Sequence, residues 1–78
     1  MSKIEKRVVD LLSAHLGLEP EDIDLMDSFR DDLHMNPSDL AEFSVKAVEE
    51  GLLTKPMNFK KIKTVSDLIE HIKTEEEL

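Results

Sequence analysis

The chain contains no cysteine, and this absence removes a whole class of chemistry. Without thiols there is no disulfide to brace the fold, no thiolate zinc site and no cysteine nucleophile. The chain also has no long apolar run, so that nothing resembles a signal peptide and no segment is long enough to span a bilayer. We therefore expect a soluble, cytoplasmic protein that does not enter membranes.

Catalytic and metal-binding patterns are missing as well. The 78 residues contain neither a nucleophile elbow nor a glycine-rich phosphate loop, and so short a chain has little room for a catalytic cleft. His15, His34 and His71 lack the spacing of metal ligands. The acid-rich residues 22–32 lack the central glycine and closing glutamate of a calcium loop. We expect no catalysis and no specific metal site.

Basic residues are scarce in the middle of the chain. The net charge is −8, and residues 17–50 hold eleven acids against only Arg30 and Lys46. This negative field repels nucleic acid and attracts basic protein surfaces. Acids can also serve only to keep a small protein in solution, but solubility alone would not confine them to one region. The pattern favours a docking surface for a basic protein.

The first third of the chain predicts a helix and then a long loop. Ser2 and Glu5 have capping-box spacing, apolar residues recur at helical intervals up to residue 16, and Gly17 suits the left-handed position after a helix. The loop that follows runs through Asn36. We expect its apolar side chains to pack onto the bundle; they are Leu18, Ile23, Leu25, Phe29 and Leu33.

A second helix is predicted from residue 37 to Gly51. Asn36 is a good N-cap and Pro37 suits the first helical position. Pro56 divides the next segment, so at most a short helix fits around residues 57–62. Thr64 and Asp67 then cap a last helix, and the acids of residues 74–78 should fray because they oppose its dipole.

No stretch alternates with the period of a strand. The sequence therefore predicts one all-α domain over residues 1–78. Its architecture is a small helical bundle with three main helices, a short fourth helix, and a long loop between the first two helices. A chain of this size buries only roughly 60% of its unfolded surface, so its core is adequate but marginal.

Three segments carry a resemblance to the acyl carrier proteins. They are "IEKRVVDLLSAHLGLEPEDI" (residues 4–23), "DSFRDDL" (27–33) and "KIKTVSDLIEHI" (61–72). The resemblance implies a monomeric, non-catalytic four-helix bundle that presents a thioester-linked acyl or related group on a 4′-phosphopantetheine arm. It also implies a phosphopantetheinyl transferase as a partner, and synthase or acyl-transfer enzymes of fatty acid biosynthesis or specialised lipid or polyketide metabolism.

The attachment motif itself is disturbed. When the family's motif Gly-Ala-Asp-Ser-Leu is aligned with this sequence without gaps, it corresponds to His34, Met35, Asn36, Pro37 and Ser38. Pro37 has no nucleophile, and a shift of one residue would rotate the helix by about 100°, which would turn Glu42 into the core. The ungapped register is therefore favoured. Two outcomes stay open: Ser38 carries the arm, or Ser38 is a plain first-turn serine in a non-carrying protein-interaction module.

The resemblance also implies a docking face. In the family, acids on the helix that follows the serine dock against basic patches of partner enzymes. The matching residues here are Asp39, Glu42, Glu49 and Glu50. Lys46 interrupts this row, and a solvated helix face is the plainer alternative. His34 and Met35 put bulk where the family keeps small residues, so they could obstruct an arm or form a different contact.

Overall fold

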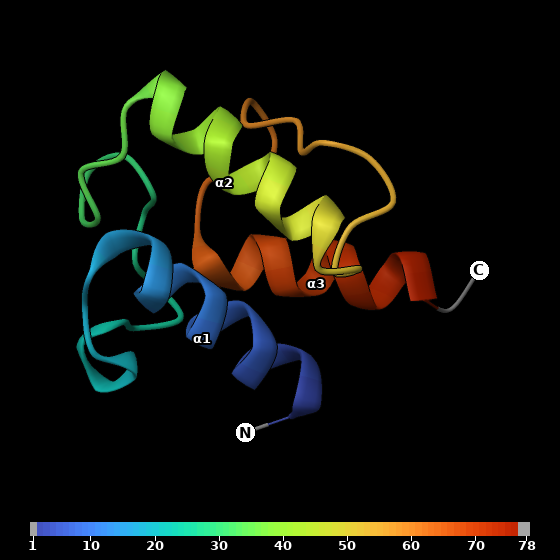
Figure 1. Ribbon diagram of the computed structural model, residues 1–78, viewed down its shortest axis with the longest axis horizontal. Helices are drawn as coiled ribbons and strands as arrows, with labels where there is room; N and C mark the ends of the chain where they lie inside the picture. The colour runs from blue at the N-terminus through green and yellow to red at the C-terminus, as the bar shows by residue number, and fades with distance from the viewer. Residues whose placement is uncertain (1, 77–78) are drawn as a thin grey trace.

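The computed structural model describes residues 2–76, which form three α-helices and a short 3-10 helix (Figure 1). The elements are α1 (Lys3–Leu16), η1 (Pro20–Asp22), α2 (Pro37–Glu49) and α3 (Val65–Glu76). Over these residues there is no strand, only an isolated antiparallel bridge between Ser28 and Thr64. The all-α prediction, with its long loop between the first two helices, is confirmed. Within the same range, no helix is long and apolar enough to cross a membrane.

Helix α1 begins and ends where its sequence signals place it. The Ser2 hydroxyl accepts the backbone N–H of Glu5 at 3.2 Å. At the other end Gly17 is left-handed, with φ 71°, and donates its N–H to the Ser13 carbonyl. Such a residue ends a helix at little steric cost because glycine has no Cβ. The buried face of α1 centres on Val8 and Leu12, both fully buried.

Two phenylalanines join the loop to the helices in the core. Phe29 from the loop and Phe43 from α2 are both buried, and their ring centroids lie 6.4 Å apart. Ile23 is also buried, but the expectation for Leu18 is wrong, because its side chain remains 41% exposed. Leu18 follows directly on the left-handed Gly17, and its N–H donates to the Ser13 carbonyl at 2.9 Å.

Backbone hydrogen bonds tie the long loop to the start of α3. Phe29 donates its N–H to the Lys63 carbonyl at 3.0 Å, and Val65 donates to the Asp27 carbonyl at 3.1 Å. Ser66 adds a bond to the Leu25 carbonyl at 2.8 Å. These bonds hold the loop in place, so the chain enters α2 from a fixed position instead of a mobile tether.

Residues 57–62, where at most a short helix was expected, form no helix. The segment makes a single turn, in which Lys61 and Ile62 donate to the Asn58 carbonyl at 3.2 and 3.0 Å. The side chain of Asn58 accepts the N–H of Lys60 at 3.0 Å, a local bond that competes with helix formation. The short fourth helical element is instead η1, in the loop after α1.

Helix α3 begins with a reciprocal cap. The Thr64 hydroxyl accepts the Asp67 N–H, and the Asp67 carboxylate accepts the backbone N–H groups of Lys63 and Thr64. These bonds, that from Lys63 foremost, hold the pKa of Asp67 below its ordinary value. The helix continues to Glu76, so residues 74–76, which the charge pattern assigned to a frayed tail, are helical. Residues 77–78 of that tail lie outside the described residues.

Candidate functional site

The first turn of α2 is fixed by a reciprocal cap. The Asn36 side chain accepts the backbone N–H of Asp39 at 2.9 Å, and the Asp39 carboxylate accepts the Asn36 N–H at 3.2 Å. Pro37 occupies the first helical position and Ser38 the second. Each cap of this kind typically contributes about 1 kcal/mol, so this turn is held firmly in one conformation.

The buried and exposed faces of α2 fix the rotation of this turn. Leu40 and Phe43 are 3% and 0% exposed, whereas Glu42 lies at the surface. Pro37 lines a hollow of about 560 Å³ between α2 and residues 57–60. Ser38 is exposed and does not line this hollow. Pro37 therefore faces the hollow, whereas Ser38 lies on the outer side of the helix.

The two bulky residues before α2 behave differently from one another. Met35 is 2% exposed, and its N–H bonds to the Phe29 carbonyl at 2.9 Å, so it fills the core and does not obstruct the surface. His34 is exposed and has a φ of 56°, in the left-handed region. In the ungapped register this position corresponds to the family's glycine, the residue that adopts such a φ without strain.

The four acids expected to form the docking face are not equivalent. Glu42 and Glu49 are exposed and line the same side of α2. Asp39 is half-buried and its carboxylate is engaged in the cap. Glu50 lies beyond the last turn, where its backbone carbonyl accepts a bond from Arg7 of α1 at 2.8 Å. The structure thus groups Glu42 with Glu49 and separates them from the other two.

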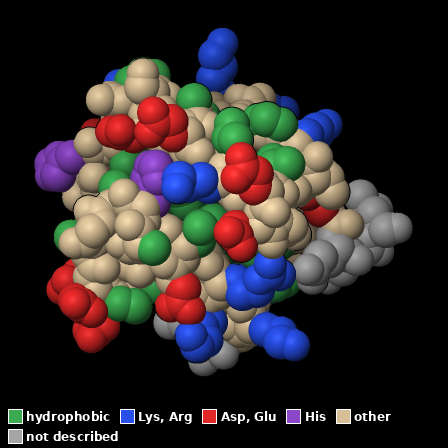
Figure 2. Space-filling view, in the orientation of Figure 1, with side chains coloured by type: hydrophobic (Ala, Val, Ile, Leu, Met, Phe, Trp, Pro, Cys, Tyr) green, Lys and Arg blue, Asp and Glu red, His purple; other side chains and the backbone are tan. Residues whose placement is uncertain are grey.

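An apolar strip that was not predicted from the sequence lies beside these two glutamates. Val45 is 50% exposed, and Ala41 lies one turn before it. Both line a hollow of about 490 Å³ with Glu42, Lys46 and Glu49. Figure 2 shows acidic and hydrophobic side chains mixed on one face of the molecule, with lysine and arginine side chains both near its centre and at its edges. The i, i+4 spacing of residues 41 and 45, opposite the buried stripe, was the available signal.

The start of α2 offers little to a phosphate group. A helix N-terminus binds anions through its unpaired N–H groups. Here Pro37 has no N–H, Asp39 donates to the Asn36 side chain, and Leu40 donates to the Asn36 carbonyl at 3.0 Å. Ser38 combines an exposed side chain with a backbone N–H that these bonds do not occupy. Any group held at this turn depends on Ser38.

The histidines take separate roles. His15 packs against the Phe43 ring, with centroids 5.7 Å apart, and His71 pairs with Glu75 at 3.0 Å. His34 lies in the loop before α2. Across residues 2–76, no three histidine, aspartate or glutamate side chains converge on a common point that could hold a metal ion.

Comparison with known proteins decides the family. The sequence model of the phosphopantetheine attachment site family matches residues 6–72. The chain belongs to this family. It is also 33% identical over 73 residues to the acyl carrier proteins of two strains of Porphyromonas gingivalis, an overlap of 92% of this chain and 94% of each relative. The prosthetic group of the family is 4′-phosphopantetheine, and the resemblance to acyl carrier proteins is confirmed.

Proposed function

We propose that this member of the family carries an acyl or related group on a 4′-phosphopantetheine arm attached to Ser38. The main support is the exposed Ser38 in the first turn of α2, while the neighbouring Pro37 has no hydroxyl. When bound, the arm supplies the thiol that holds the acyl group as a thioester. Carriers of this kind are not catalysts, and the chain itself is expected to perform no reaction.

The roles of the neighbouring residues follow from their positions. Asn36 and Asp39 hold the first turn rigid, so that Ser38 is presented in one orientation. Glu42 and Glu49, on either side of Val45, offer charges and an apolar contact to a basic partner surface. We infer that the partners are a phosphopantetheinyl transferase and synthase or acyl-transfer enzymes of fatty acid or specialised lipid or polyketide metabolism. We also infer a cytoplasmic monomer that binds neither nucleic acid nor membranes.

A second candidate function is a protein-interaction module that no longer carries a group. In the ungapped register Pro37 takes the family's serine position, and the first turn has lost two of its anion-binding donors to proline and to the cap. Under this alternative Ser38 is a plain first-turn serine, and α2 docks to a basic partner without an arm.

The mass of the protein purified from its native host separates the two functions. If the chain is a carrier, the wild type gains the mass of one phosphopantetheine and Ser38→Ala does not. Ser66→Ala is the matched control, because Ser66 holds the same second position in α3; it should keep the added mass. A wild type found only at the mass of the bare chain would support the non-carrying module instead.

A further inference from the structure

The segment after α2 has a charge opposite to that of the chain as a whole. Residues 51–66 contain four lysines and no acid, in a chain whose net charge is −8. Among residues 2–76, the ion pairs of the structure join Lys6 to Asp10, His71 to Glu75 and Lys73 to Glu5. None of them uses a lysine of this segment. A run of lysines is often only a solvated surface, so its place in the fold decides its role.

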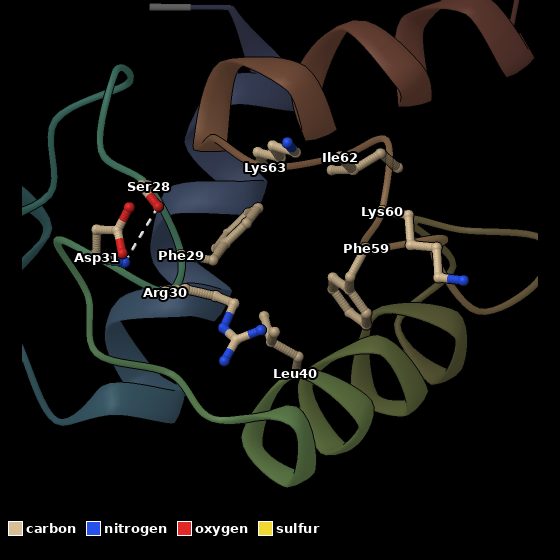
Figure 3. Close-up of a pocket in the computed structure, with 9 residues that line it drawn as sticks. All are labelled: Ser28, Phe29, Arg30, Asp31, Leu40, Phe59, Lys60, Ile62 and Lys63. Carbon is tan, nitrogen blue, oxygen red and sulfur yellow. Dashed lines mark hydrogen bonds between the residues drawn. The ribbon is translucent and has the colours of Figure 1, made fainter.

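The fold brings an arginine from the loop before α2 beside two of these lysines. Arg30, Lys60 and Lys63 line one hollow of about 530 Å³, of which the half-buried Phe59 forms a wall (Figure 3). The side chain of Lys60 points outward, and that of Arg30 reaches toward Leu40 on α2 (Figure 3). All three cationic residues are exposed. We call Arg30, Lys60 and Lys63 the basic surface.

Neighbouring acids do not cancel the charge of the basic surface. Asp31 also lines the hollow, but it lies at the Ser28 edge, where its N–H donates to the Ser28 hydroxyl at 3.1 Å. Lys60 lies on the opposite side of the hollow (Figure 3). The Asp67 carboxylate is engaged in the cap of α3, where it accepts the backbone N–H of Lys63 at 3.0 Å. An excess of positive charge therefore faces the solvent at the edge beside α2.

The basic surface adjoins the acidic face of α2. Arg30 and Lys60 line the hollow that extends to the first turn of α2, together with Ala41. Glu42 and Glu49 line a separate hollow with the same alanine. The exposed Ala41 thus lies between surfaces of opposite charge on the two sides of α2. A protein that docks along α2 and reaches its first turn contacts both charges.

We propose that the basic surface binds an acidic segment of the protein that docks on α2. This partner presents basic residues to Glu42 and Glu49 and acidic residues to Arg30 and Lys60, so that both contacts are complementary in charge. A partner whose docking patch is basic throughout is attracted by the glutamates and repelled by the two cations. The basic surface therefore also discriminates against such partners. The proposal rests on the proposed docking of a partner to α2, which both candidate functions share, and not on an arm at Ser38.

The test titrates short peptides into the isotopically labelled full chain, in the Ser38→Ala form that cannot hold an arm on that residue. The acidic probe alternates glutamate with alanine, and the neutral probe has glutamine in place of glutamate. The net charge of −8 repels an anionic peptide, so a preference for the acidic probe reports on local charge. At low ionic strength the acidic probe should bind about fivefold more tightly than the neutral probe, as expected for exposed ion pairs. It should shift the backbone amides of residues 30–31 and 59–63.

Variants of the chain assign the preference to the basic surface. Arg30→Gln with Lys60→Gln should bring the affinity for the acidic probe down to that for the neutral probe. Lys3→Gln with Lys6→Gln is the matched control, because it makes the same change in net charge at two exposed positions of α1; it should keep the preference. Arg30→Lys with Lys60→Arg retains both charges and should keep the preference as well. The amide spectrum of each variant reports whether it is folded.

Any of four outcomes overturns the proposal: no binding of either probe, equal affinity for the two probes, shifts outside residues 30–31 and 59–63, or equal losses in the two glutamine double variants. The last would mean that the acidic probe responds only to net charge.

A third probe tests the docking face of α2 separately. It has lysine in place of glutamate, and its shifts should fall on residues 41–49. Failure of the acidic probe alone would remove the basic surface and leave the docking face in place. Failure of the lysine probe would contradict the docking face itself, and with it the proposal. The carrier function is read independently, from the mass of the native protein.

Discussion

The hydroxyl of Ser44, 1% exposed, accepts the backbone N–H of Met57 at 2.7 Å and so joins α2 to the segment that follows it. No regular secondary structure holds residues 52–63, so this bond takes the place of a helix or strand ladder there. The bond places Met57 in the core. It thereby also helps to position Phe59, which forms a wall of the hollow beside α2.

Replacing Ser44 by alanine should therefore destabilise the fold by about 1–3 kcal/mol, because the Met57 N–H would stay buried without a partner. Equilibrium unfolding in urea measures the change. Ser38→Ala, at an exposed position of the same helix, is the control and should change stability by no more than about 0.5 kcal/mol. Equal stability of the two variants would show that water readily replaces the Ser44 bond.

A second prediction concerns the backbone before α2. His34 has a φ of 56°, where a side chain costs roughly 1–2 kcal/mol, whereas glycine loses only about 0.5–1 kcal/mol through the entropy of the unfolded chain. His34→Gly should thus raise the free energy of unfolding by about 0.5–1 kcal/mol. Gly17→Ala, at a φ of 71°, is the opposite change and should lower it. A less stable His34→Gly chain would mean that the imidazole makes a contact worth more than the strain.

Local signals in the sequence predicted the helix ends well. Ser2, Asn36 and Thr64 each cap a helix through a bond to a residue three positions on, so the partners are fixed by spacing alone. The single turn after Pro56 escaped prediction, because the Asn58 side chain and the Ser44 hydroxyl decide it, and Ser44 lies on another element. Local pattern cannot give such tertiary partners.

The candidate site was predicted only in part, again because local pattern gives helix ends but not tertiary contacts. The position of Pro37 and Ser38 at the start of a helix followed from the Asn36 cap and the proline. The left-handed turn at His34, which brings the Met35 N–H to the Phe29 carbonyl, did not follow from the local pattern. The hollow beside Arg30 is formed by three segments distant in sequence and has no signature in any one of them.

The docking face gives a third prediction. Glu42→Lys with Glu49→Lys should slow association with a basic partner enzyme by about tenfold or more and remove its acceleration at low salt. Both side chains are exposed, so the stability of the fold should change little. The rate is measured against a partner enzyme captured from the native host on the immobilised wild type.

The control for that experiment introduces the same change in net charge at other positions on the surface. Glu21→Lys with Glu70→Lys makes the same change in net charge at two exposed positions away from α2. This variant should bind at nearly the wild-type rate. If both double variants lose the same fraction of the rate, the partner responds to net charge and not to a face of α2.

The last prediction concerns the rotation of Ser38. A broad-specificity phosphopantetheinyl transferase with coenzyme A should leave the wild-type chain mostly unmodified, as read by intact mass, so that the proposed arm on Ser38 requires the transferase of the native host. The reason is that, in the ungapped register, Ser38 lies about 100° around the helix from the family's serine position. Pro37→Ser with Ser38→Leu should be modified readily. This variant places a hydroxyl at the first helical position, where Pro37 now lines the hollow, and leaves Leu40 and Phe43 buried. Loss of the proline costs little there, because several other residues suit that position.

Pro37→Ala with Ser38→Leu removes both candidate acceptors and is the control that should gain no mass. Rapid and complete modification of the wild type at Ser38 would show that the transferase does not read the direction of the hydroxyl, and the chain would then be loaded as an ordinary carrier.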